Sequence, residues 1–243
     1  ATREGYVYKL DTRLRPSGNA GPLVTSLESF LCYHRTEAQI WERQAMAKAR
    51  VVIGEPTLRS SIDAVIRQTV YGASLGDEGR QEIHRLRMRM ENEIAKETAG
   101  SYNIKTGRGG MVDVEFIAQY LQLRYGQHYP ELRTQNTVVA LKEVQTLGII
   151  TEQQADTLIA GYKFLRKLEN RLRLLHDHSI NDLAGDQHYL DKLARRLAYD
   201  PRLRHPGEAL LKDYEATTEA IRDVYERILG ELAEEHVTEE KDL

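Results

Sequence analysis

The feature that most constrains the fold is the recurrence of apolar side chains at helical spacing over the second half of the chain. From residue 114 onward, leucine, isoleucine and valine return every three or four positions, which is the period of one buried helix face. Five such rows cover residues 114–121, 138–147, 158–175, 190–197 and 210–232. Thr151 and Gln154 form a capping-box pattern before the third row. Rows of this length bury their apolar faces against one another, so the sequence predicts a mainly α protein with a helical bundle over residues 106–243.

The composition is that of an ordinary soluble protein. Of its 243 residues, 41% are hydrophobic, and the formal net charge is −3. This charge argues against a general binder of nucleic acids or membrane surfaces, and no apolar run approaches the roughly 20 residues of a membrane span. The single cysteine, Cys32, permits no internal disulfide. We therefore expect a cytoplasmic protein with no nucleic-acid partner and no membrane partner.

The N-terminal stretch differs from the bundle, because its charges alternate as they would on one face of a strand. A strand over residues 6–15 is predicted. Its charged face would hold Lys9, Asp11, Arg13 and Arg15. One carboxylate among several cations suits a metal-bound, multiply charged phosphate ligand. The alternative is a solvated sheet face with local ion pairing.

Five motifs carry a resemblance to a known family. They are DTRLRPSG at 11–18, GPLV at 21–24, WE at 41–42, AKAR at 47–50 and GGMVDVEFIAQ at 109–119. In this order they resemble the glutamine synthetase adenylyltransferase (adenylyl-removing) family through at least the first half of the chain. The resemblance implies that residues 1–105 are the C-terminal part of a polymerase-beta-like nucleotidyltransferase domain, an α+β fold, followed by the bundle over 106–243.

The resemblance also implies a function in nitrogen metabolism. Members of the family have two catalytic halves: one transfers AMP from ATP to a tyrosine of glutamine synthetase, and the other removes it by phosphorolysis. The amino-acid sequence of the 11–18 motif and the acidic tail are similar to those of the C-terminal, adenylylating half. The deadenylylating half is the close alternative. From a different class, the chain could be a non-catalytic helical regulatory module that binds the signalling protein PII or glutamine synthetase.

Asp11 is the catalytic and metal-binding candidate that the resemblance implies. In such nucleotidyltransferases three carboxylates hold two divalent metals, here Mg²⁺, and Asp11 matches the third carboxylate. Hard oxygen ligands suit Mg²⁺, and Arg13 and Arg15 match positions that can neutralise phosphate charge. No Gly-Ser turn with an acidic pair precedes Asp11. We therefore expect a fragment that is inactive alone.

A second group of candidates could contact ATP. A helix capped at Ser26 is predicted to extend toward the apolar residues before Gly54. Trp41 and Lys48 would share a face of it and could form one side of a nucleotide site; alternatively, Trp41 is core and the Lys48 stem packs on it. The remaining nucleotide-binding candidates implied by the motifs are Arg50, Arg108, Asp113 and Glu115.

Asp113 and Glu115 are not expected to hold one metal ion together. The following residues continue at helical period, and residues two apart on a helix point roughly 200° away from each other. The alternative to a role near the nucleotide is that both carboxylates simply favour the positive end of the helix.

Two other polar clusters are interpreted as surface. The basic segment with Arg85, Arg87 and Arg89 is predicted to be a solvated helix face paired with glutamates. His176, Asp177 and His178 are interpreted as a polar loop at a helix end, because no second ligand cluster accompanies them.

Overall fold

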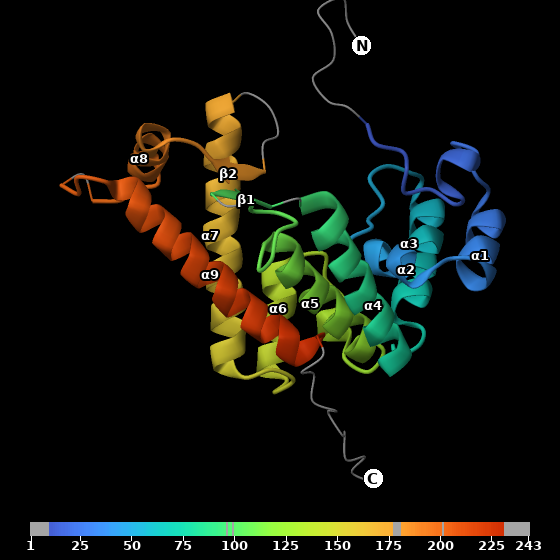
Figure 1. Ribbon diagram of the computed structural model, residues 1–243. Coiled ribbons are helices and arrows are strands. Elements are labelled where there is room, and N and C mark those ends of the chain that lie inside the picture. Colours follow the sequence, from blue (N-terminus) through green and yellow to red (C-terminus); the bar gives the residue numbers. More distant parts are fainter. Residues whose placement is uncertain (1–9, 96, 99, 177–180, 201, 231–243) are drawn as a thin grey trace, which may run out of the picture. The chain divides into compact units, whose positions relative to one another are not determined.

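A computed structural model describes residues 10–230, apart from residues 96, 99, 177–180 and 201. The described chain is mainly helical, as predicted (Figure 1). It divides into two compact units, Ala1–Ala73 and Ser74–Leu243. None of the described helices is long and apolar enough to cross a membrane.

The first unit contains three helices among its described residues. They are α1 (Leu27–Thr36), α2 (Ile40–Met46) and α3 (Pro56–Tyr71), preceded by a 3-10 turn at Gly18–Ala20. Both α1 and α2 pack on α3. The Arg43 side chain of α2 donates to the carbonyl oxygens of Val70 and Ala73, which fixes the end of α3.

The strand predicted for residues 6–15 is wrong for the part that the structure describes. Residues 1–9 lie outside the described residues, and residues 10–13 have no regular secondary structure. The Arg13 backbone and guanidinium both donate to the Asp11 carboxylate, at 3.0 and 2.6 Å. Arg15 donates to the carbonyl oxygens of Thr12 (2.7 Å) and Gly21 (3.1 Å). These local hydrogen bonds compete with the backbone pairing that a strand would need.

The predicted long helix after Ser26 is two helices. The cap itself is confirmed, because Ser26 Oγ accepts from the Ser29 amide at 3.1 Å. However, α1 ends at Thr36, and α2 begins with its own capping box, in which Glu42 Oε2 accepts from the Gln39 amide at 2.8 Å. Lys48 therefore follows α2 rather than lying on the same helix as Trp41.

The second unit is built from six helices and a two-stranded sheet among its described residues. In order they are α4 (Asp77–Met90), a π-helical turn (Glu91–Ala95), β1 (Ser101–Asn103), α5 (Met111–Tyr125), a 3-10 turn (Pro130–Leu132), α6 (Thr137–Thr146), α7 (Glu152–His176), β2 (Asp182–Ala184), α8 (Gln187–Arg196) and α9 (Pro206–Ile228). The five predicted apolar rows correspond to α5 through α9. The capping box is confirmed, since Thr151 and Gln154 each accept from the other's backbone amide, at 3.2 and 2.9 Å.

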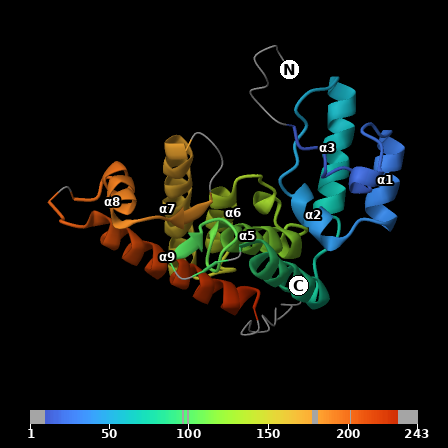
Figure 2. The same ribbon diagram turned by 45° about the horizontal axis from the view of Figure 1, so that its top comes forward.

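The helix α9 connects the bundle along its length. It crosses α7, lies beside α8 at its N-terminal end and reaches α5 at the other end (Figures 1 and 2). The apolar rows supply a core with no exposed surface: Leu141, Leu158, Leu165, Leu168, Leu172, Leu193, Leu210 and Ile221. The rows predicted from the sequence therefore form one continuous core in this unit.

The short antiparallel sheet was not predicted. Strand β1 pairs with β2 with Tyr102 opposite Leu183, and strands of three residues are too short to reveal alternation in the sequence. The sheet lies in the second unit, which begins at Ser74, ahead of the predicted junction near residue 105. The assignment of residues 1–105 to a nucleotidyltransferase domain stays a prediction.

One glycine allows the turn before α5 to approach α9. Gly109 has a φ of 69°, and a Cβ at this position would overlap the carbonyl oxygen of Thr218 on α9. Both the backbone conformation and the close contact therefore require glycine. Gly148 also has a φ of 69°, but a Cβ there would meet no atom within 4 Å.

These two glycines give a matched prediction. Gly148→Ala should lower the free energy of unfolding by about 1 kcal/mol, the cost of the left-handed conformation alone. Gly109→Ala should lower it by about 3 kcal/mol, because displacement of α9 adds to that cost. Urea unfolding followed by circular dichroism measures both, and equal losses would contradict the close packing of Gly109 on α9.

Candidate functional site

A cavity of about 240 Å³ lies within the first unit. It is lined by Leu14, Arg15, Pro16, His34, Trp41, Glu42, Ala45, Met46, Lys48 and Ala49. The chain thus brings together Arg15, Trp41 and Lys48, three of the residues singled out from the sequence. Although Lys48 is not on α2, the turn that follows this helix returns it to the same cavity as Trp41.

The cavity combines an aromatic surface with positive charge. The Trp41 residue is 42% exposed, so the alternative of a core tryptophan is wrong. Arg15 is held through Nε and Nη1 by backbone carbonyls, while its Nη2 makes no hydrogen bond to a described residue. A guanidinium fixed in this way can present its remaining donor to an anion.

The carboxylate that lines the cavity is already engaged. Glu42 accepts from the Gln39 amide and, at 2.7 Å, from the Tyr33 hydroxyl. That hydrogen bond raises the pKa of Tyr33. Burial lowers the pKa of His34, which favours its neutral form. The cavity is therefore suited to an anionic ligand that has a flat apolar group.

Asp11 lies outside the lining of this cavity and forms an exposed ion pair with Arg13. Arg13 Nε and Nη2 donate to the Asp11 carboxylate at 2.9 and 2.6 Å, and this hydrogen bonding raises the pKa of Arg13. Among the described residues, no three acidic, histidine or cysteine side chains gather as a metal site. The metal role expected of Asp11 therefore stays a prediction.

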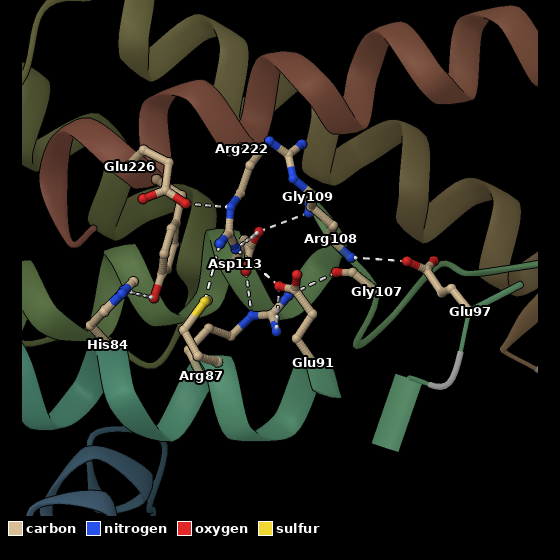
Figure 3. A network of polar contacts seen from close by, with 12 residues as sticks. His84, Arg87, Glu91, Glu97, Gly107, Arg108, Gly109, Asp113, Arg222 and Glu226 are labelled. Carbon is tan, nitrogen blue, oxygen red and sulfur yellow. Dashed lines mark hydrogen bonds and ion pairs between the residues drawn. The ribbon is translucent and has the colours of Figure 1, made fainter. Parts of the chain in front are cut away.

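Asp113 lies at the centre of a buried network in the second unit (Figure 3). It has no exposed surface, and neither has Arg87 of α4, whose Nε donates to Asp113 Oδ1. Arg87 Nη2 also donates to the Gly107 carbonyl at 2.7 Å. Asp113 Oδ2 accepts from the Gly109 amide at 2.8 Å. The network thus fixes the turn that precedes α5.

A second arginine reaches the same carboxylate from α9. Arg222 Nη1 lies 3.5 Å from Asp113 Oδ2 and 3.0 Å from Glu91 Oε2, and its Nε lies 2.7 Å from Glu226 (Figure 3). Its guanidinium also lies over the Tyr225 ring, 4.7 Å from the centroid. Burial raises the pKa of Glu91, and the two arginines oppose this effect.

The other candidates of the second unit point away from Asp113. Glu115 accepts from the Tyr162 hydroxyl of α7 at 2.7 Å, and burial together with this carboxylate raises the pKa of Tyr162 to about 12. Arg108 pairs with Glu219 at 2.6 Å on the surface. As predicted for a helix, Asp113 and Glu115 do not face one ligand. Their role near a nucleotide, like that of Arg108 and the exposed Arg50, stays a prediction.

Comparison with known proteins identifies the family. The model of the family described as glutamate-ammonia ligase adenylyltransferase matches residues 1–65, and that of GlnD PII-uridylyltransferase matches residues 79–229. A bifunctional glutamine synthetase adenylyltransferase/adenylyl-removing enzyme of a Bradyrhizobium species (strain BTAi1) is 35% identical over 214 residues, 86% of this chain and 21% of that protein. The enzyme of the same description from Bradyrhizobium diazoefficiens is 32% identical over 232 residues, 93% of this chain and 22% of that protein.

The chain belongs to the glutamine synthetase adenylyltransferase family, with a second unit of the GlnD PII-uridylyltransferase type. It spans about a fifth of the length of the curated relatives that it matches. The first family match ends at residue 65 and the second begins at residue 79. The boundary between the two compact units, after Ala73, falls within this interval of the sequence.

The two arginines that hold Asp113, Arg87 and Arg222, were not predicted from the sequence. Arg87 was interpreted as part of a solvated face, which is wrong for this residue, although Arg85 and Arg89 do pair on the surface with Glu82 and Glu93. Position 87 follows the buried Ile83 by one helical turn. A charged residue within an apolar row was the signal that could have identified it.

Arg87 and Arg85 lie two positions apart on α4 and test the network directly. Arg87→Met should lower the free energy of unfolding by about 3 to 5 kcal/mol, because it leaves buried Asp113 without its closest cation. Arg85→Met, which breaks an exposed pair, should cost less than about 1 kcal/mol. Urea unfolding measures both variants, and an additional Asp113→Leu change should recover part of the loss. Similar costs for the two arginines would contradict a buried role for Arg87.

Proposed function

We propose that the protein to which this chain contributes transfers AMP from ATP to a tyrosine of glutamine synthetase and thereby regulates nitrogen assimilation in the cytoplasm. The relatives named above support this assignment by their activity. The observation that carries the proposal for this chain is the convergence of Arg15, Trp41 and Lys48 on one cavity.

The cavity supplies two of the interactions that an adenine nucleotide needs. An exposed indole face can stack on a nucleobase, an interaction worth about 1–3 kcal/mol per base. A fixed guanidinium and a lysine ammonium on the same cavity can neutralise phosphate oxygens. In this proposal the base of ATP lies on Trp41, and its phosphates extend toward Arg15 and Lys48.

Asp11 is the proposed metal ligand of this chain. Its carboxylate oxygens suit Mg²⁺, and its exposed pair with Arg13 contributes little stability, so a divalent cation could displace the arginine. The released Arg13 would then be available to phosphate. A bound divalent metal stabilises the charge that develops on the transferring phosphoryl group. The other ligands would come from elsewhere in the protein, so the chain alone is expected to be inactive.

The amino-acid sequence of the motif at residues 11–18 favours the adenylylating half of the family over the deadenylylating half. A second candidate function rests on the match of residues 79–229 to the GlnD PII-uridylyltransferase model. In this alternative the second unit is a helical regulatory module that contacts PII or glutamine synthetase, and the first unit carries the nucleotide chemistry.

The metal role of Asp11 predicts the result of a conservative substitution. In the full-length protein, Asp11→Asn should reduce AMP transfer to glutamine synthetase by about 100-fold or more, because the amide keeps the shape but loses the charge that holds a hard cation. Transfer of label from ATP measures the effect. Glu28→Gln on α1, an exposed carboxylate outside the cavity lining, is the control and should leave transfer unchanged. Near-normal transfer by Asp11→Asn would exclude a metal role.

The cavity predicts a separate effect on ATP affinity. Arg15→Ala and Lys48→Ala should each weaken ATP binding to the full-length protein several-fold, and Arg15→Lys should not restore it fully, because lysine lacks the planar fork. Equilibrium dialysis with labelled ATP measures the affinity. Arg35→Ala removes an exposed charge of α1 that does not line the cavity and should have no effect. Unchanged ATP affinity in both cavity variants would show that Arg15 and Lys48 do not bind the nucleotide.

A further inference from the structure

A second cavity, of about 710 Å³, lies within the second unit between the start of α6 and the middle of α7. It is lined by Gln135, Asn136, Thr137, Val138, Tyr162, Lys163, Arg166, Lys167, Asn170 and Arg171. The two helices pack side by side, so the lining comes from one contiguous part of the fold (Figure 1). We call this cavity the α6–α7 groove.

The α6–α7 groove is strongly basic. Four of its lining residues are cations, all of them on α7, and none is acidic. Arg166, Lys167 and Arg171 lie three, four and eight residues after Lys163, which places them on one face of the helix. At 1.5 Å of rise per residue, the row extends about 12 Å. This length exceeds what one phosphate group needs.

The two cations at the ends of this row have no partner among the described residues. Arg166 pairs with Glu169 at 2.9 Å, and Lys167 Nζ donates to the Leu197 carbonyl at 3.2 Å. No ion pair or hydrogen bond of the Lys163 or Arg171 side chain to a described residue is formed. The groove therefore keeps two uncompensated positive charges, separated by eight residues of α7.

The start of α6 adds to the positive potential. Asn136 caps this ten-residue helix, with Oδ1 accepting from the amides of Val138 (3.0 Å) and Val139 (3.2 Å). The positive end of the helix dipole therefore faces the groove from the side opposite α7. The groove is also held in shape, because Tyr162 is anchored to Glu115 of α5.

We propose that the α6–α7 groove binds a small polyanion with at least two linked phosphate groups, as a ligand separate from the nucleotide of the first unit. Lys163 and Arg171 contact the two ends of the ligand, and the start of α6 contributes positive charge between them. A ligand with linked phosphates matches a row of cations better than a single anion does, because it engages both ends at once. This site goes beyond the adenylyl transfer proposed above and does not depend on it.

The test is isothermal titration of the chain with sodium tripolyphosphate and pyrophosphate in the absence of divalent metal. Both probes should bind, with orthophosphate at least tenfold weaker. The double variant Lys163→Ala with Arg171→Ala should weaken tripolyphosphate binding at least tenfold. The control variant Lys192→Ala with Arg195→Ala removes the same charge from exposed positions of α8 and should retain binding. Circular dichroism melts should be unchanged in both, because all four side chains lie outside the buried core.

Four results would overturn the proposal. One is that neither probe binds, and another is that the α8 control weakens binding as much as the groove variant. The third is loss of binding in Arg15→Ala with retention in the groove variant, because the probe would then occupy the cavity of the first unit. If an acidic peptide such as oligoglutamate binds in the groove while tripolyphosphate does not, the site is a protein-docking surface and the proposed ligand class is wrong.

Discussion

The second unit depends on the buried carboxylate of Asp113. Arg87 from α4 and Arg222 from α9 meet at this side chain, so one residue of α5 connects helices that are far apart in the sequence. Removing these charges from water is costly, and the cost is offset by the ion pairs and hydrogen bonds that the two guanidinium groups make. Arg87 Nη1 and Arg222 Nε form no hydrogen bond, but they lie 3.2 Å from Glu91 and 2.7 Å from Glu226. Gly107 and Gly109 supply the remaining contacts, which leaves the turn before α5 with little freedom. A misplaced α9 would leave a buried charge unpaired, so the network favours a single packing arrangement.

The two carboxylates of the motif that begins α5 point to different sides of this helix. Asp113 and Glu115 are two positions apart, and the helical period sends the first toward α4 and α9 and the second toward Tyr162 on α7. Both carboxylates of this motif make packing contacts in the second unit, and their role near a nucleotide stays a prediction. The aromatic and basic cavity of the first unit, by contrast, has the chemistry of a ligand site.

The parts of the fold that were predictable are those in which local sequence and tertiary packing agree. The apolar rows predicted α5 through α9, and the capping residues Ser26 and Thr151 are used as expected. The prediction of a strand near Asp11 was wrong because Arg13 and Arg15 form hydrogen bonds with residues close to them in the sequence. The break before α2 was missed because the Glu42 cap competes with helix continuation, and burial of Arg87 was missed because its partner Asp113 is 26 residues away. Periodicity reports burial of apolar groups, not the pairing of buried charges.

The two basic cavities differ in what they can recognise, although both lie in a chain whose net charge is −3. Screening limits the reach of exposed charges to about 8–10 Å at physiological ionic strength. Attraction is therefore set by the cations that line each cavity, and the overall charge has little influence. Around Trp41, two cations accompany an exposed aromatic face, so a ligand gains from stacking as well as from charge. In the α6–α7 groove, Lys163 and Arg171, which have no partner among the described residues, lie about 12 Å apart along α7. The hydroxyl of Tyr162 in this groove is already engaged by Glu115. The two proposals therefore assign a ligand with a nucleobase to the first cavity and a ligand of linked phosphates without a base to the second.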